Sequence, residues 1–220
     1  MKRILGMALF LGIVLVAGGC DEIGDAVGGV RGSGNLITEE RDVSGFDEIV
    51  ILGSGDVTVS VTGTESLLIE AEDNIMPLLT TEVKNGRLEL GSKKSYSTSK
   101  GVKYTITAAT LDGLEINGSG DVYATGIDVE SFEVEINGSG DVNAEGTSAQ
   151  LDVGISGSGR YDGEGLVAAF GVVSVSGSGT AVVNVTDDLV ASVSGSGSID
   201  YIGDPVLDAD TSGSGNISQR

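Results

Sequence analysis

A Gly-Ser-Gly triplet recurs along this chain at nearly even spacing. The triplets begin at residues 32, 53, 118, 138, 157, 177, 195 and 213. Apart from a gap of 65 residues between the second and third triplets, the intervals lie between 18 and 21 residues. Sixteen of the 36 glycines belong to these triplets, so the high glycine content is a periodic signal and not the composition of a flexible linker.

Apolar residues alternate with polar residues on both sides of the triplet. Two residues before the triplets stand Val30, Ile51, Ile116, Ile136, Ile155, Val175, Val193 and Thr211. The second residue after each triplet is, in turn, Leu36, Val57, Val122, Val142, Tyr161, Ala181, Ile199 and Ile217. Alternation with a period of two predicts strands that bury one face.

One such repeat cannot bury its apolar face alone, whereas repeats stacked about 4.8 Å apart form continuous apolar ladders. We therefore predict an all-β fold over residues 31–220, a single-stranded β-solenoid with coils of roughly 19 residues and Gly-Ser-Gly corners. Glycine suits the corner because it accepts positive φ and allows stacked backbones to approach closely. The handedness of parallel crossovers favours a right-handed β-helix.

The regular coils are expected over about residues 114–217 and irregular coils over about 56–117. The long gap contains a hairpin signal, "EVKNGRLEL" at Glu82–Leu90, and "NIMPLL", which predicts a short turn or helical bend. We expect the solenoid to continue through the gap with distorted or protruding coils. Strand-like runs occur there at Asp56–Val61, Leu67–Ala71, Arg87–Leu90 and Val102–Ala108.

The N-terminus has the pattern of an export signal. Two basic residues precede an apolar stretch, Ile4–Ala17, which is followed by two glycines and Cys20. The stretch is short for a membrane span, and a cysteine after small residues resembles the lipobox of bacterial lipoproteins. We predict a signal peptide at 1–19 and a lipidated Cys20 that begins a tether over 20–30. The protein would then be exported and anchored to the periplasmic face of the inner membrane or to the outer membrane. The alternative is an uncleaved anchor helix with an incidental cysteine.

Composition narrows the chemistry that this chain can perform. It has no His and one Cys, which excludes Ser-His and Cys-His nucleophile pairs, His-ligated zinc and an internal disulfide. The net charge of −21 repels nucleic acid and anionic lipid, so neither is an expected electrostatic partner. We expect no enzymatic activity, no cofactor and no nucleic-acid partner. A carbohydrate-active β-helix enzyme that uses a carboxylate pair and a Lys or Arg stays open, although five Tyr and four Phe offer few sugar platforms.

The irregular segment reverses the charge of the chain. Its basic residues have only Glu89 as an acid among them, and they are candidates for an interaction patch that binds an anionic glycan, lipopolysaccharide or an envelope protein. The alternative, which charge runs of this kind favour, is a solvated loop, or weak ion pairs onto the acidic solenoid. The residues concerned are Lys84, Arg87, Lys93, Lys94, Lys100 and Lys103.

Aspartates directly after two triplets are weak candidates for a calcium site. Asp121 and Asp141 would stack on neighbouring rungs, but hard cations require six or more oxygen ligands. Arg160 occupies the next rung and could instead pair with Asp141, so the prediction is that no metal binds. A calcium-dependent structural module stays open as an alternative.

Several segments resemble one bacterial family in both order and spacing. They are "GSGNLITEERDVSGFDEIVILGSGDVTV", "PLLTTEVKNGRLELGSKK" and the repeated "INGSGDV". From about Arg31 to the C-terminus, the chain is similar to the putative autotransporter adhesins with a head GIN domain. The resemblance implies a β-helix-like fold on exported, often lipid-anchored proteins, with adhesion inferred and no catalytic residues established. The predicted function is a non-enzymatic, lipid-anchored envelope protein that presents a solenoid surface for adhesion or for protein or glycan contact; the oligomeric state is left open.

Overall fold

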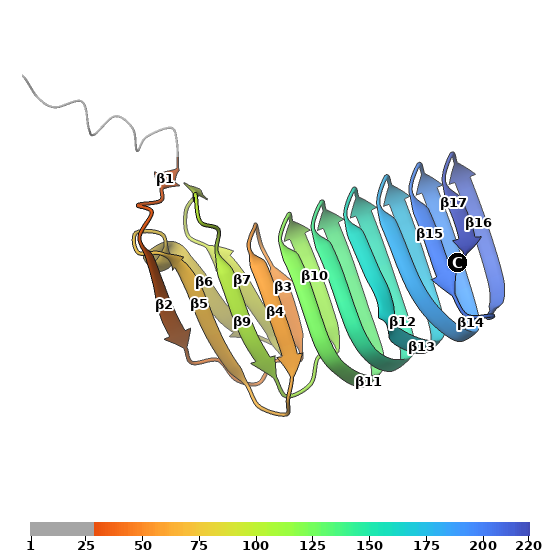
Figure 1. Ribbon diagram of the computed structural model, residues 1–220, viewed down its shortest axis with the longest axis horizontal. Helices are drawn as coiled ribbons and strands as arrows, with labels where there is room; N and C mark the ends of the chain where they lie inside the picture. The colour runs from red at the N-terminus through yellow and green to blue at the C-terminus, as the bar shows by residue number, and fades with distance from the viewer. Residues whose placement is uncertain (1–28) are drawn as a thin grey trace, which may run out of the picture.

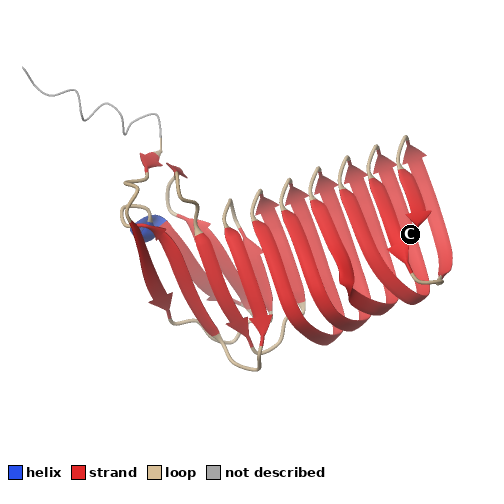
Figure 2. Ribbon diagram, in the orientation of Figure 1, coloured by secondary structure: helices blue, strands red, loops and turns tan. Residues whose placement is uncertain are grey.

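The computed structural model describes residues 29–220, which form an elongated stack of β-strands (Figures 1 and 2). The predicted signal peptide, Cys20 and nearly all of the predicted tether lie outside the described residues. Within the described part, no helix is long and apolar enough to cross a membrane.

The described part of the chain is almost entirely β-structure, with one short 3₁₀ helix. The elements in chain order are β1 (Val30–Arg31), β2 (Leu36–Arg41), β3 (Glu48–Ile51), β4 (Asp56–Val61), β5 (Ser66–Glu72), η2 (Met76–Leu78), β6 (Leu79–Lys84), β7 (Arg87–Ser92), β8 (Tyr96–Ser97), β9 (Lys103–Ala108), β10 (Gly113–Gly118), β11 (Asp121–Gly138), β12 (Asp141–Gly157), β13 (Arg160–Gly177), β14 (Thr180–Gly195), β15 (Ser198–Ile202), β16 (Val206–Gly213) and β17 (Asn216–Gln219).

The predicted β-solenoid is confirmed from β10 onward. Each long strand from β11 to β14 begins after one triplet, bends around the coil and ends in the next triplet. Successive coils pair in parallel, with register shifts within each of the long strands β11, β12 and β13. On both sides of these shifts the apolar positions of the repeat form ladders that are almost completely buried. One ladder consists of Ile51, Ile116, Ile136, Ile155, Val175 and Val193.

Backbone hydrogen bonds run through the Gly-Ser-Gly corners as well as through the strands. The amide of Ser139 donates to the carbonyl of Gly118 at 2.9 Å, and later corners repeat this contact. Gly138 has a φ of +151°, and a Cβ at this position would overlap the carbonyl oxygen of Gly118. The corner therefore requires glycine for both its conformation and its close stacking.

The residues in the long gap between triplets form an excursion from the stack. Because of it, the spatial order of the coils differs from their order in the chain. β3 pairs with β10 and β4 pairs with β11, so the coil before the gap stacks directly on the coil after it. The excursion lies on the other side of that first coil, where β7 and β9 pair in parallel with β3 and β4. The prediction that the solenoid continues through the long gap is thus right for one coil, the one formed by β7 and β9. Beyond it, β5, β2 and β6 add antiparallel strands that close this end.

Two local predictions within the excursion are confirmed. β6 and β7 form the hairpin, and its turn holds Asn85 and Gly86 with positive φ of 52° and 84°. Positive φ at both turn residues is the conformation that Asn-Gly favours. The helical bend is η2, which has a proline in its first turn.

The prediction that all eight triplets belong to one ladder is wrong for the first. The amide of Gly34 donates to the Oε1 atom of Glu72 at 2.8 Å, and the Ser33 hydroxyl donates to Asp73. Leu36, expected in the core, is 46% exposed. The reason is that β2 pairs antiparallel with β5 and does not continue the coil stack.

The opposite end of the solenoid is the last coil, formed by β16 and β17. β16 pairs with β14 on one side only and is exposed along its whole length. Its inward-facing Leu207 is 37% exposed because no further coil among the described residues covers it. An open strand edge of this kind can associate with other strands.

Candidate functional site

Three of the six basic residues in the predicted interaction patch form ion pairs. The Nζ atom of Lys84 lies 2.6 Å from Glu82 and 3.0 Å from Glu89. Lys103 lies 3.6 Å from Glu70. Arg87 pairs with two carboxylates of the solenoid. These contacts are the ion pairs with acidic neighbours that the alternative interpretation describes. The six basic residues therefore do not share one common environment.

The other three basic residues share one exposed loop. Lys93, Lys94 and Lys100 lie between β7 and β9, in the segment that replaces the Gly-Ser-Gly corner of that coil. Arg31 is next to this loop because β1 pairs with β8, with Arg31 opposite Ser97. Over residues 29–220, no carboxylate lies within ion-pair distance of these four side chains. We call these four residues the basic loop surface.

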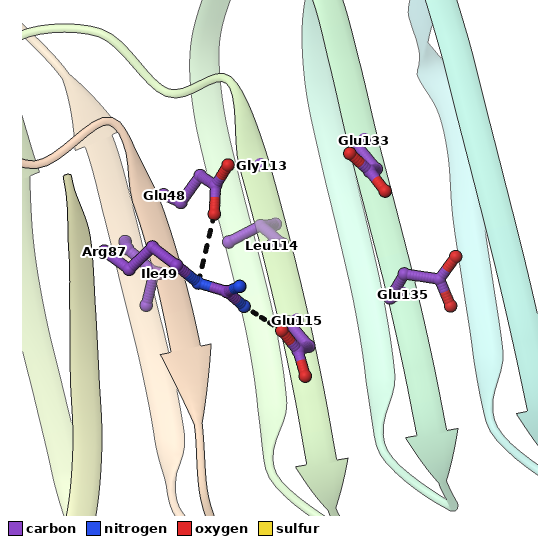
Figure 3. Close-up of a pocket in the computed structure, with 8 residues that line it drawn as sticks. All are labelled: Glu48, Ile49, Arg87, Gly113, Leu114, Glu115, Glu133 and Glu135. Atoms are coloured by element: carbon purple, nitrogen blue, oxygen red, sulfur yellow. Dashed lines mark hydrogen bonds and ion pairs between the residues drawn. The ribbon is translucent and has the colours of Figure 1, made fainter. Parts of the chain in front are cut away.

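Arg87 lies in a hollow of about 120 Å³ on the outer face of the first coils (Figure 3). Its Nε atom is 3.2 Å from Glu48, and its guanidinium also contacts Glu115. Gly113 makes room for this arrangement, since a Cβ there would be only 3.0 Å from the Cγ atom of Glu48. The bridge joins three strands, β7, β3 and β10, that are distant in the sequence.

Carboxylates continue along the same face beyond the reach of Arg87. Figure 3 shows Glu133 and Glu135 on the next coil, away from the guanidinium. Burial raises the pKa of Glu135, and the neighbouring charges of Glu133, Asp152 and Glu115 raise it further. The arrangement is an acidic outer face with one cation that bridges two of its carboxylates.

The aspartate column is held by backbone contacts. Asp56, Asp121 and Asp141 occupy successive rungs, with Lys103 beside the first and Arg160 beside the last. The amide of Asp141 donates to the Asp121 carboxylate at 3.2 Å, which gives Asp121 a structural contact. No ion pair joins Arg160 to Asp141 in the described chain, and residues 29–220 hold no group of three or more metal-ligating side chains.

The outer face changes character in the last regular coils. At the position of Glu133 and Asp152 in earlier coils stand Val172 and Val190, which pair in register. They are 48% and 47% exposed, and Phe170 beside them is 47% exposed. We call Phe170, Val172 and Val190 the apolar strip.

Serines extend the uncharged area next to the apolar strip. Ser174 and Ser192 occupy the position that Glu115 and Glu135 hold in earlier coils. The sequence pattern did not predict this face, because the argument for the fold used only the buried positions of each repeat. An alignment of the outward-facing columns from coil to coil would have shown the change from acid to valine and serine.

The comparisons with known proteins agree with this fold. The family model described as putative auto-transporter adhesin, head GIN domain, matches residues 45–205. A crystal structure of a putative adhesin from Bacteroides fragilis is 29% identical, covers 87% of this chain and 100% of that chain, and has a TM-score of 0.73. A comparison with curated proteins gives no match.

Two further crystal structures share the fold at lower identity. A putative adhesin from Parabacteroides merdae is 17% identical over 87% of this chain and 98% of that chain, with a TM-score of 0.55. A putative lipid binding protein from Parabacteroides distasonis is 24% identical over 87% and 99%, with a TM-score of 0.52. The family match spans most of the described residues, and the chain therefore belongs to the family described as putative auto-transporter adhesin, head GIN domain.

Proposed function

We propose that this protein is a non-enzymatic component of the bacterial cell envelope, anchored by lipid at Cys20, whose solenoid makes adhesive contact with a protein or glycan. The observation that carries the proposal is the apolar strip with its neighbouring serines, an uncharged area on an otherwise acidic outer face. Contact surfaces are depleted of charge at their centres and enriched in aromatic residues. Phe170 supplies such a side chain, and Ser174 and Ser192 supply hydroxyls that can bond a glycan or a backbone.

The rigidity of the scaffold favours the same function. Val172 and Val190 project from paired central strands of the stack, so their spacing is set by the backbone ladder. A preordered surface loses little conformational freedom on binding, which favours affinity. Membership of an adhesin family supports this use of the surface.

Anchoring is tested by expression of the full chain and a Cys20→Ser variant in a bacterial host. The expected result is that wild-type protein partitions with membranes and that its processed N-terminal peptide carries acyl groups. The variant is expected to lose both properties. Wild-type protein with an unmodified Cys20 would contradict the anchor and leave the contact surface to be judged separately.

Contact is tested with the soluble chain, residues 21–220, immobilised against envelope extracts and a glycan panel. A variant with Phe170→Ser, Val172→Ser and Val190→Ser is expected to lose at least about tenfold in affinity for its best ligand. The matched control replaces three other exposed apolar residues, with Leu36→Ser, Leu52→Ser and Leu68→Ser, and is expected to bind like wild type. Equal binding by both variants would contradict the assignment of the apolar strip.

A further inference from the structure

Positive charge is concentrated at one end of the solenoid. Of the ten basic residues from position 29 onward, eight lie at or before Lys103. After Lys103 the basic residues are Arg160 and Arg220, against eighteen Asp and Glu. The coils from β10 onward are therefore strongly acidic, whereas the end that carries the excursion holds most of the cations.

The basic loop surface sits where the described chain begins. The amide of Val30 donates to Ser95 at 3.0 Å, and the amide of Gly32 donates to Ser97 at 2.8 Å. These bonds attach β1 to the loop that carries Lys93, Lys94 and Lys100. Figure 1 shows β1 at the end of the stack opposite the C-terminus.

The length of chain before β1 limits how far this end can lie from an anchor. Eight residues lie between Cys20 and Gly29, and the nine steps from one Cα atom to the other span at most about 32 Å when fully extended. If Cys20 is acylated, as proposed above, the basic loop surface stays within that reach of the bilayer. The last coils, β16 and β17, are at the other end of the stack.

We propose that the basic loop surface docks on anionic lipid headgroups of the membrane that holds the anchor. Lys and Arg side chains are attracted to an anionic bilayer once they lie within a Debye length, about 8 Å at physiological ionic strength. The four cations have no ion-pair partner in the described chain, so docking breaks no internal pair. The same field repels the acidic coils, which stand away from the bilayer and present the apolar strip outward.

Local acids reduce this attraction but do not cancel it. Glu72 is buried beneath Gly32–Gly34, and Asp73 accepts a hydrogen bond from Ser33. Glu82 is a third acid nearby, since its pKa is lowered by Lys84, with which it pairs, and also by the charge of Lys93. Among the described residues, Lys84 and the four cations of the basic loop surface therefore face three acids. The docking inference rests on the proposed anchor and adds the orientation that the anchored protein takes.

The test uses the single cysteine of the chain. Protein comprising residues 20–220 is coupled through Cys20 to maleimide lipid in vesicles of phosphatidylcholine, with or without phosphatidylglycerol. Lysines are then acylated briefly and quantified by mass spectrometry. At low salt on anionic vesicles, modification of Lys93, Lys94 and Lys100 is expected to slow by at least roughly threefold, and 1 M salt is expected to remove the protection. Lys84, in the hairpin at the opposite edge of the coil, serves as the internal reference.

Two variants with equal changes in net charge complete the design. Replacement of Lys93, Lys94 and Lys100 by Ser is expected to abolish salt-dependent orientation, followed as the thickness of the protein layer by neutron reflectometry. The control, with Lys84→Ser, Arg160→Ser and Arg220→Ser, is expected to orient like wild type. Equal lysine modification on neutral and anionic vesicles would overturn the proposal. It would also be overturned if the loop bound a soluble anionic glycan while its lysines stayed unprotected on anionic vesicles. Because coupling is chemical, either result leaves the test of acylation in cells unaffected.

Discussion

Ile51 and Ile116 lie side by side in neighbouring parallel strands, although 65 residues separate them in the chain. Both side chains are buried in the same ladder as Ile136. The intervening excursion leaves the stack and returns to it, so two coils pack as though they were consecutive. This register places the side chains of three distant segments next to one another.

The corner glycines are expected to be irreplaceable where backbones stack. Gly138→Ala forces a Cβ against the Gly118 carbonyl at a φ of +151°, so we expect the free energy of unfolding to fall by about 3 kcal/mol or more. Urea denaturation followed by circular dichroism measures the change. The control is Ser139→Ala in the same corner, which is expected to alter stability by less than about 0.5 kcal/mol. Equal effects of the two variants would contradict the stacking argument.

The Arg87 bridge is expected to contribute modestly to stability. Its partners are partly exposed, so loss of the bridge in Arg87→Ala should cost about 1 kcal/mol of unfolding free energy at low salt. The loss should shrink at high salt, because the unbalanced carboxylates then repel one another less. Arg160→Ala removes a cation that has no ion pair in the described chain and should cost less. A salt-independent loss at Arg87 would indicate packing by its aliphatic stem instead.

Glu135 is expected to weaken the fold at neutral pH. Burial raises its pKa in the folded state, so the folded protein binds a proton more tightly than the unfolded chain, and ionisation destabilises the fold. Glu135→Gln should therefore raise the free energy of unfolding at pH 7. The gain should vanish as the pH falls below the ordinary glutamate pKa of about 4.3, where wild-type Glu135 is also protonated. Glu130→Gln, an exposed change on the same strand, is the control in pH-dependent urea titrations.

Glu72 is expected to hold β1 and the first triplet in place above acidic pH. Hydrogen bonds, led by that of the Thr98 hydroxyl, lower the pKa of Glu72 below its ordinary value in spite of burial. The stabilising contribution is present above the unfolded-state pKa and is lost as the pH falls through the folded-state pKa. Hydrogen exchange should show the Gly34 amide losing protection in acid before the coils open.

The same segment should loosen at neutral pH in Glu72→Gln, because a neutral amide oxygen accepts the hydrogen bonds of Gly34 and Ser99 more weakly than a carboxylate does. Glu70→Gln on the same strand removes a carboxylate that pairs with Lys103 and should leave Gly34 protected. Unchanged exchange of Gly34 in Glu72→Gln would show that the β1–β8 pairing suffices by itself.

Local patterns predicted the coil, its corners, the hairpin and the bend. These features depend on residues close in sequence: alternation sets which side of a strand is buried, and Asn85-Gly86 sets the hairpin turn. The first triplet shows where this reasoning ends. Its amino-acid sequence is the same as that of the other triplets. However, the amide of Gly34 donates to Glu72 on a different strand, and this triplet does not stack on the other corners.

The candidate surfaces depended on contacts that run between coils. The six basic residues are neighbours in sequence, yet Lys84 and Arg87 pair with carboxylates. Lys93 and Lys94 are exposed in the loop, where the Lys93 ammonium donates to the carbonyl of Pro77. The apolar strip arises from an outward column, where Val172 and Val190 follow acids on preceding coils.

The repeat pattern is enough to predict that the chain winds into stacked coils, because each repeat carries its own alternation and its own corner. The order of the coils in the stack depends on pairing between distant strands. Several coils have similar apolar edges, so the pattern within one coil does not specify which coil packs beside it. That order placed Ile51 beside Ile116 and Arg87 between Glu48 and Glu115. It also placed the lysine loop beside β1, because pairing between distant strands decides which edges meet.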